Sequence, residues 1–206
     1  MFFFRTFLVT LVSLVGAWIP AAAQINLTPR LNIPLPVGAT REYGTPHWGY
    51  GGTVGYQFFP HWEALAAYDR YRFELNTSLK NLNVDPNLII LLNLPETITL
   101  SLSSDTWNSG VHYRRSFARL SAYVGAEIST NRIVAEGYGI RIIRHYWGLA
   151  PVVGADWMFT ARWGAHVDTR LQTIFTRQDI PFVNQVIDEY LMFLPIQAGI
   201  TAKISW

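Results

Sequence analysis

The residues best suited to chemistry lie close together in the C-terminal third of the chain. His166 and Asp168 are two positions apart, with Arg162 and Arg170 at positions of the same parity on either side. Alternate residues of a β-strand point to the same side, so these four side chains would share one face of a strand. A histidine beside a carboxylate could act as a general base with its orienting partner. Because the sequence fixes no nucleophile nearby, and structural ion pairs use the same residue types, we predict no catalytic residue and keep a hydrolase as the alternative.

Cysteine is absent from the 206 residues. This excludes disulfides, thiolate metal sites, a catalytic thiol and the lipid-bearing cysteine of a lipoprotein. We predict no cofactor and no metal site. The glycines at positions 49, 51, 52 and 55 could be a phosphate-binding loop, but such a loop needs a strand before it and a helix after it. Here they alternate with aromatic and branched residues, which favours small side chains facing the inside of a narrow barrel.

The overall charge points to no nucleic-acid partner. Sixteen Lys and Arg residues stand against fourteen Asp and Glu residues, a net charge of +2. Phosphate binding requires clustered cations, and the chain has no run of Lys or Arg.

The first residues have the layout of a signal peptide. Arg5 precedes an apolar stretch at 7–18, and small residues follow at 21–23. We therefore predict a signal peptide over 1–23, cleavage between Ala23 and Gln24, and one mature domain over 24–206. An uncleaved membrane anchor is the alternative, although the stretch is short for a span of about 20 residues.

The last segment, 190–206, alternates strictly between apolar and polar side chains. Period-two alternation indicates a strand with one apolar and one polar face. The same pattern recurs in seven earlier segments, at 25–33, 48–58, 62–76, 107–113, 122–128, 147–159 and 163–175. The fold class predicted from this pattern is all-β, an eight-stranded antiparallel transmembrane β-barrel.

The connections between these segments differ in length. Short ones near 60, 117 and 161 alternate with long ones near 34–47, 77–97, 130–145 and 177–189. Outer-membrane barrels have short periplasmic turns and long extracellular loops, so both mature termini are expected in the periplasm. In the second long loop, the apolar run from Leu88 to Leu92 could be a short helix or a continued strand.

Aromatic residues gather near the strand ends, as expected for two girdles at the lipid head groups. One set is Phe58, Tyr113, Trp157, Phe159, Trp163 and Trp206; the other is Trp48, Trp107, Trp147, Phe175 and Tyr190.

These residues give the chain from Ile25 to Trp206 an overall pattern that resembles the OmpA/OmpX-like family of small outer-membrane barrels. The resemblance implies a bacterial outer-membrane location. It also implies that the final strand, which ends in Trp206 where the family usually has Phe, is the signal read by the barrel-assembly machinery. The resemblance is architectural and carries over no ligand site.

The polar phase of the strands predicts a charged interior network. Its members are Arg70, Arg72, Glu74, Arg114, Glu127, Asp156, Arg162, His166, Asp168, Arg170 and Lys203. Cations outnumber carboxylates in this set, six to four. Asp69 falls on the apolar phase of its segment, so we expect a bulge or phase shift there.

The function predicted from this pattern is that of an integral, monomeric outer-membrane barrel with a structural or loop-mediated binding role in the cell envelope. A narrow channel and a lipid-modifying barrel enzyme are the alternatives. Outer-membrane lipid is the expected surrounding partner. Arg132, Arg141 and Arg144, placed in the third long loop, could pair with lipopolysaccharide phosphates, or the loop could simply be solvated.

Overall fold

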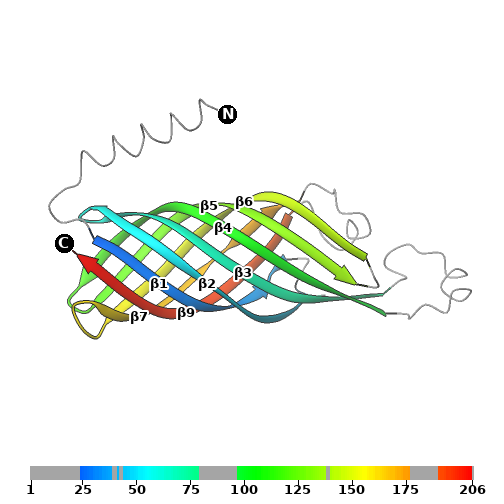
Figure 1. The fold of residues 1–206 in the computed structure, drawn as a ribbon, viewed down its shortest axis with the longest axis horizontal. Coiled ribbons are helices and arrows are strands. Elements are labelled where there is room, and N and C mark those ends of the chain that lie inside the picture. The colour runs from blue at the N-terminus through cyan, green and yellow to red at the C-terminus, as the bar shows by residue number, and fades with distance from the viewer. Residues whose placement is uncertain are drawn as a thin grey trace, which may run out of the picture.

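The strands close into a ring. The computed structural model describes residues 24–38, 41, 44–78, 97–137, 140–176 and 190–205. The strands are β1 (Gln24–Pro36), β2 (Gly44–Phe59), β3 (Trp62–Ser78), β4 (Thr97–Phe117), β5 (Leu120–Gly137), β6 (Ile140–Met158), β7 (Trp163–Arg170), β8 (Gln172–Phe175) and β9 (Tyr190–Ser205). Neighbours pair antiparallel, and β9 also pairs with β1, which closes the ring (Figure 1).

The ring has eight positions, because β7 and β8 occupy the same one. Both lie between β6 and β9, and they keep one register with those strands on either side of Leu171. The predicted eight-stranded antiparallel barrel is therefore confirmed. Within the described ranges, no helix has the length and apolarity needed to cross a membrane.

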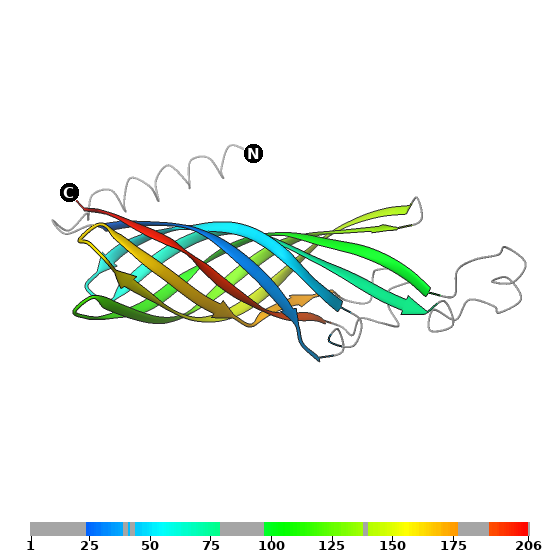
Figure 2. The same ribbon diagram turned by 90° about the horizontal axis from the view of Figure 1, so that it is seen from below.

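One end of the barrel, called here the turn end, carries the short connections. These are Pro60 and His61, the pair Ala118 and Arg119, and the four residues 159–162. Ala118 has a positive φ of 52°, which suits a two-residue hairpin turn between the paired residues Phe117 and Leu120. Gln24 pairs with Ser205, so the first and last described strands meet at the same end (Figure 2).

At the opposite end, called here the long-strand end, β3 to β6 extend well beyond the other strands (Figure 1). The predicted loop over 130–145 is wrong, because β5 runs to Gly137 and β6 restarts at Ile140. The predicted connections at 34–47 and 77–97 are likewise shortened by strand at their ends. Among the described residues, the outward side chains of these extensions are largely polar, as with Arg72, Ser101 and Glu136, so the sequence there lacks the apolar alternation of a lipid-facing strand.

Several predictions concern residues outside the described ranges. These are the signal peptide over 1–23 with its cleavage site after Ala23, the Leu88 to Leu92 run, the connection at 177–189 and Trp206.

Candidate functional site

The turn-end half of the barrel is filled by charged side chains, which we call the interior charge network. Its members are Arg30, Glu63, Asp69, His112, Arg114, Glu127, Asp156, His166, Asp168 and Arg170, and each is at most 7% exposed. Every one of them lies at an inward position of its strand, because successive side chains of a strand alternate between the two faces.

Two arginines connect the middle of this network. Arg30 donates to both carboxylate oxygens of Asp69, at 3.0 Å and 2.7 Å, and to Asp168 at 3.2 Å. Arg170 donates to Glu127 at 2.6 Å, to Asp168 at 3.2 Å and to Gln197 at 3.0 Å. Paired Arg–carboxylate bonds of this kind fix geometry as well as charge. Because these residues come from β1, β3, β5, β7 and β9, the network ties together strands across the barrel.

A third arginine joins the network nearer the turn end. Arg114 donates to Glu63 Oε2 at 3.1 Å and 2.8 Å and also bonds to Asp156. Its guanidinium carbon lies 4.8 Å from the centre of the Tyr123 ring, which is within cation–π range. Tyr123 also stacks on His112, with ring centres 4.7 Å apart.

His166 bridges two carboxylates. Its Nδ1 lies 2.7 Å from Asp156 Oδ1 and its Nε2 lies 3.3 Å from Asp168 Oδ2. Ionised carboxylates only accept hydrogen bonds, and both nitrogens of histidine donate only in the imidazolium form. The geometry therefore suits a charged His166 that acts as a fourth cationic link beside the three arginines.

Each buried carboxylate of the network contacts at least one basic side chain. The network holds five carboxylates, three arginines and two histidines. His112 contacts Glu127 at 3.1 Å, as His166 contacts its own partners. Buried ions are tolerated only when they are paired and hydrogen-bonded, so this matching explains how so many charges fit inside one small barrel.

Glycine makes room for two of these carboxylates. A Cβ on Gly51 would overlap the Asp69 carboxylate, and a Cβ on Gly55 would overlap the Glu63 carboxylate. The glycines of β2 thus allow the backbone to approach the charge network closely.

The structure places six of the predicted network residues in the buried interior: Arg114, Glu127, Asp156, His166, Asp168 and Arg170. Lys203 lies at an inward position of β9 and is partly buried.

The prediction is wrong for four residues. Arg72 is exposed and Glu74 is 46% exposed at its side chain, so both face outward, as does Arg70. Asp69 shows why: it lies inside, 0% exposed, and β3 keeps one phase from Glu63 to Phe73 with an unbroken register against β4. The irregularity expected near Asp69 lies instead in the neighbouring strand β2, between His47 and Tyr50. From Asp69 toward the long-strand end, the apolar side chains of β3 point inward, which is the reverse of what we expected. Arg162, the fourth, is exposed in the turn after β6.

Sequence reasoning missed four network members, which are Arg30, Glu63, Asp69 and His112. It also missed two uncharged partners of the network, Tyr123 and Gln197. Arg30 and His112 stand on the polar phase of clearly alternating strands, so that signal was present. Glu63 and Asp69 are six positions apart, so both side chains lie on the same face of the strand. Two acidic residues on one face could have identified that face as the inner one.

Toward the long-strand end the interior becomes apolar. The apolar interior cluster consists of Tyr71, Phe73, Leu102, Ile133, Ala135, Ile174, Leu191 and Phe193. Tyr71 and Phe193 pack edge to face with ring centres 4.8 Å apart. Gln197 joins the two regions, since its amide donates to Asp69 and to the Tyr71 hydroxyl, both at 3.3 Å.

The interior leaves little open space at the level of the charge network. A cavity there has a volume of about 20 Å³ and is lined by residues that include Arg30, Arg114 and Tyr123. This is room for roughly one water molecule.

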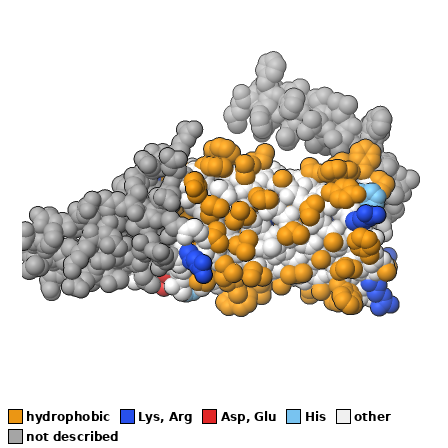
Figure 3. Space-filling model, turned by 180° about the vertical axis from the view of Figure 1, so that it is seen from behind, with side chains coloured by type: hydrophobic (Ala, Val, Ile, Leu, Met, Phe, Trp, Pro, Cys, Tyr) orange, Lys and Arg blue, Asp and Glu red, His pale blue; other side chains and the backbone are white. Residues whose placement is uncertain are grey.

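The outer face is the reverse of the interior. Large apolar side chains that are 42–62% exposed cover it between the strand ends, including Val111, Val124, Ile128, Leu149 and Val153 (Figure 3). Exposed aromatics lie at the two ends of this surface: Phe59, Trp62, Phe117, Trp157, Phe159 and Trp163 at the turn end, and Trp48, Trp107, Trp147 and Tyr190 toward the long-strand end. An apolar band between aromatic girdles is the surface of a transmembrane barrel.

Solved structures support this assignment of the fold. No protein-family model and no curated protein matches the chain. The outer membrane protein OprG of Pseudomonas aeruginosa superposes with a TM-score of 0.62 at 10% identity, over 91% of this chain and 98% of that one. A major outer membrane protein of Thermus thermophilus gives 0.55 at 11% identity, over 89% and 100%. Neisserial surface protein A gives 0.53 at 12% identity, over 89% and 97%. The chain therefore has the fold of the small bacterial outer-membrane β-barrels of the OmpA/OmpX-like type.

Proposed function

We propose that the protein is an integral outer-membrane barrel that serves the cell envelope through its outer surface and its long-strand end, without a conducting pore. The observation that carries this proposal is the filled interior. The Arg30 and Asp69 pair and its partners occupy one level, and the apolar interior cluster occupies the next. An eight-stranded barrel is just wide enough for its side chains to fill it.

The narrow-channel alternative is less favoured. Ions crossing the barrel would have to separate buried pairs such as Arg170 and Glu127, which are 2.6 Å apart, and then cross an apolar layer. Leaving either charge unpaired in such a site is costly.

The lipid-modifying enzyme alternative is also less favoured. His166 and Asp168 lie together, as a general base and its partner would, but both are buried inside the barrel and occupied by ion pairs. A lipid substrate would meet the outer face, where neither side chain is accessible.

Planar bilayer recordings of the purified, refolded protein test the proposal. We expect no steady conductance, together with a mobility difference between boiled and unboiled samples on SDS gels, because a closed strand ladder has no edge from which to unravel. Stable porin-sized openings would contradict the filled interior. If boiled and unboiled samples migrate alike, the refolded protein does not form a closed barrel.

The proposal includes the processing and orientation of the chain. The mature protein begins at Gln24, the turn end lies in the periplasm, and Trp206 belongs to the signal that the barrel-assembly machinery reads. Mass spectrometry of the protein from the membrane fraction should find Gln24, or its cyclised form, at the N-terminus. Retention of Met1 would contradict the signal peptide.

A further inference from the structure

Two transverse rows of side chains lie on the outer face of β3, β4, β5 and β6. The paired residues Tyr68, Trp107, Thr130 and Trp147 form an aromatic row. Two positions farther toward the long-strand end, Arg70, Asp105, Arg132 and His145 form a charged row in the same register. Below the aromatic row the surface is apolar, with Ile128 and Leu149 exposed. The aromatic row therefore lies where the lipid chains give way to head groups.

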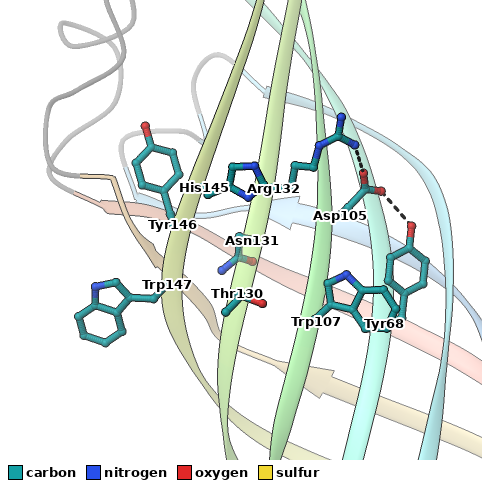
Figure 4. Close-up of a pocket in the computed structure, with 9 residues that line it drawn as sticks. All are labelled: Tyr68, Asp105, Trp107, Thr130, Asn131, Arg132, His145, Tyr146 and Trp147. Carbon is teal, nitrogen blue, oxygen red and sulfur yellow. Dashed lines mark hydrogen bonds and ion pairs between the residues drawn. The ribbon is translucent and has the colours of Figure 1, made fainter. Parts of the chain in front are cut away.

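A surface groove opens where the two rows meet. It has a volume of about 610 Å³ and is lined by both tryptophans and by Arg132 and His145. The tryptophan side chains are directed apart on either side of the short Thr130, while Arg132 and His145 stand above it (Figure 4). Trp107 is 62% exposed and Trp147 is 52% exposed, so broad aromatic surface faces outward at this level.

The charged row along the upper side of the groove holds two arginines and one carboxylate. Asp105 accepts from the Tyr68 hydroxyl at 2.9 Å and lies 3.3 Å from Arg132 Nη1 and 3.7 Å from Arg70 Nε. One carboxylate, 14% exposed at its side chain, is thus shared by two arginines, and the more exposed of them, Arg132 at 43%, lines the groove. A guanidinium carries five N–H donors, so Arg132 can keep its contact with Asp105 and still donate to an anion. His145 supplies a further donor.

We propose that this groove binds the phosphorylated head group of a membrane lipid in the leaflet at the long-strand end. The occupant follows from the level and charge of the site: Arg132 and His145 meet the phosphate, and Trp107 and Trp147 flank the sugar and upper chain of the same molecule. Charge-assisted bonds from arginine to phosphate supply the affinity. This inference rests on the proposed function, because it requires the barrel to be embedded with its apolar band in lipid.

The test compares two forms of one lipid. The protein in detergent micelles is titrated with bisphosphorylated lipid A and with the same lipid after removal of both phosphates, and bound lipid is counted by native mass spectrometry. We expect the phosphorylated form to bind more tightly. Arg132→Gln combined with His145→Gln should weaken that binding by about tenfold or more, the size expected for losing charge-assisted hydrogen bonds.

The control is Arg141→Gln, which removes an exposed cation on the same hairpin. Arg141 pairs with Glu136 on the outer face, four residue pairs beyond the charged row toward the long-strand end and away from the groove. The Arg141→Gln variant should show the same preference for the phosphorylated lipid as the unmodified protein. Equal binding of both lipid forms, or equal loss in the control, would overturn the inference. So would a change in oligomeric state on the double substitution without any lipid preference, which would assign the groove to contact between protein chains.

The gel mobility of each sample separates this inference from the proposed function. A protein that keeps its folded mobility but shows no phosphate preference refutes the lipid site alone. A protein without folded mobility refutes the closed barrel and the lipid site together.

Discussion

The two halves of the barrel have opposite arrangements of polar and apolar side chains. Near the turn end, charges such as Asp168 fill the interior while apolar side chains such as Val124 face outward. Near the long-strand end, Leu102 and its neighbours fill the interior while Arg72 and Ser101 face outward. The strands continue through both halves without a change of phase in β3, β4 or β5. We infer that the medium outside decides which side of a strand is apolar, with lipid around the first half and water around the second.

The largest expected effect concerns the interior charge network. Asp168→Asn removes a carboxylate whose side chain is 1% exposed and which contacts Arg30, Arg170 and His166. Removing one partner of a buried ion pair leaves a buried charge without compensation, at a cost of about 3–5 kcal/mol. Urea titrations of the protein in lipid should show a correspondingly lower free energy of unfolding.

The matched control lies in the other half of the barrel. Glu136→Gln breaks a 2.8 Å pair with Arg141 in which both side chains are more than half exposed. Exposed pairs contribute less than about 1 kcal/mol, so the urea midpoint of the Glu136→Gln variant should stay close to that of the unmodified protein. Equal midpoints for the two substitutions would mean that water reaches Asp168 as freely as it reaches Glu136.

The second effect concerns the outer face. Val124 pairs with Val153 midway between the two aromatic ends and is 55% exposed. Val124→Arg puts a charge against lipid and should cost about 2–4 kcal/mol. Ser101→Arg adds the same side chain on the outer face above the charged row, where water is the expected medium.

The measurement is the unfolding midpoint of each variant refolded into vesicles. Ser101→Arg should stay within about 0.5 kcal/mol of the unmodified protein, as surface substitutions usually do. A large loss at Ser101 would place that region inside the membrane and remove the contrast between the halves.

The same contrast explains how much could be predicted from sequence. Where one face meets lipid, as along β9, alternation identified the strand and its outer face, and the strand count followed. In β3 the rule that apolar means outward failed above Asp69, because Tyr71 and Phe73 are apolar and inward. Alternation reports that two faces differ, and only the position relative to the membrane tells which of them faces in.

The candidate sites were harder to predict for a related reason. Arg114, Asp156, His166, Asp168 and Arg170 were placed inside by phase alone. Their partners come from strands distant in sequence, as with Arg30 and Asp168, which lie 138 positions apart. The groove at Arg132 depends on cross-strand register over four strands, and a single sequence without the pairing does not contain that register.

The smallest expected effect tests the packing of the apolar interior cluster. Ile174 is 0% exposed, so Ile174→Val leaves a space one carbon in size among close-packed neighbours, at a cost of about 0.5–1.5 kcal/mol. Ile128→Val makes the same change on the lipid-facing surface, where Ile128 is 62% exposed and mobile lipid chains can fill the gap, so we expect a change within about 0.5 kcal/mol. Both residues are β-branched before and after substitution, so strand propensity and rotamer freedom stay nearly constant. Urea midpoints at unchanged slope measure the difference, since an unchanged slope means that the surface exposed on unfolding is the same. If Ile128→Val costs as much as Ile174→Val, the interior above the charge network is no better packed than the protein–lipid boundary, and the cluster does not seal the barrel.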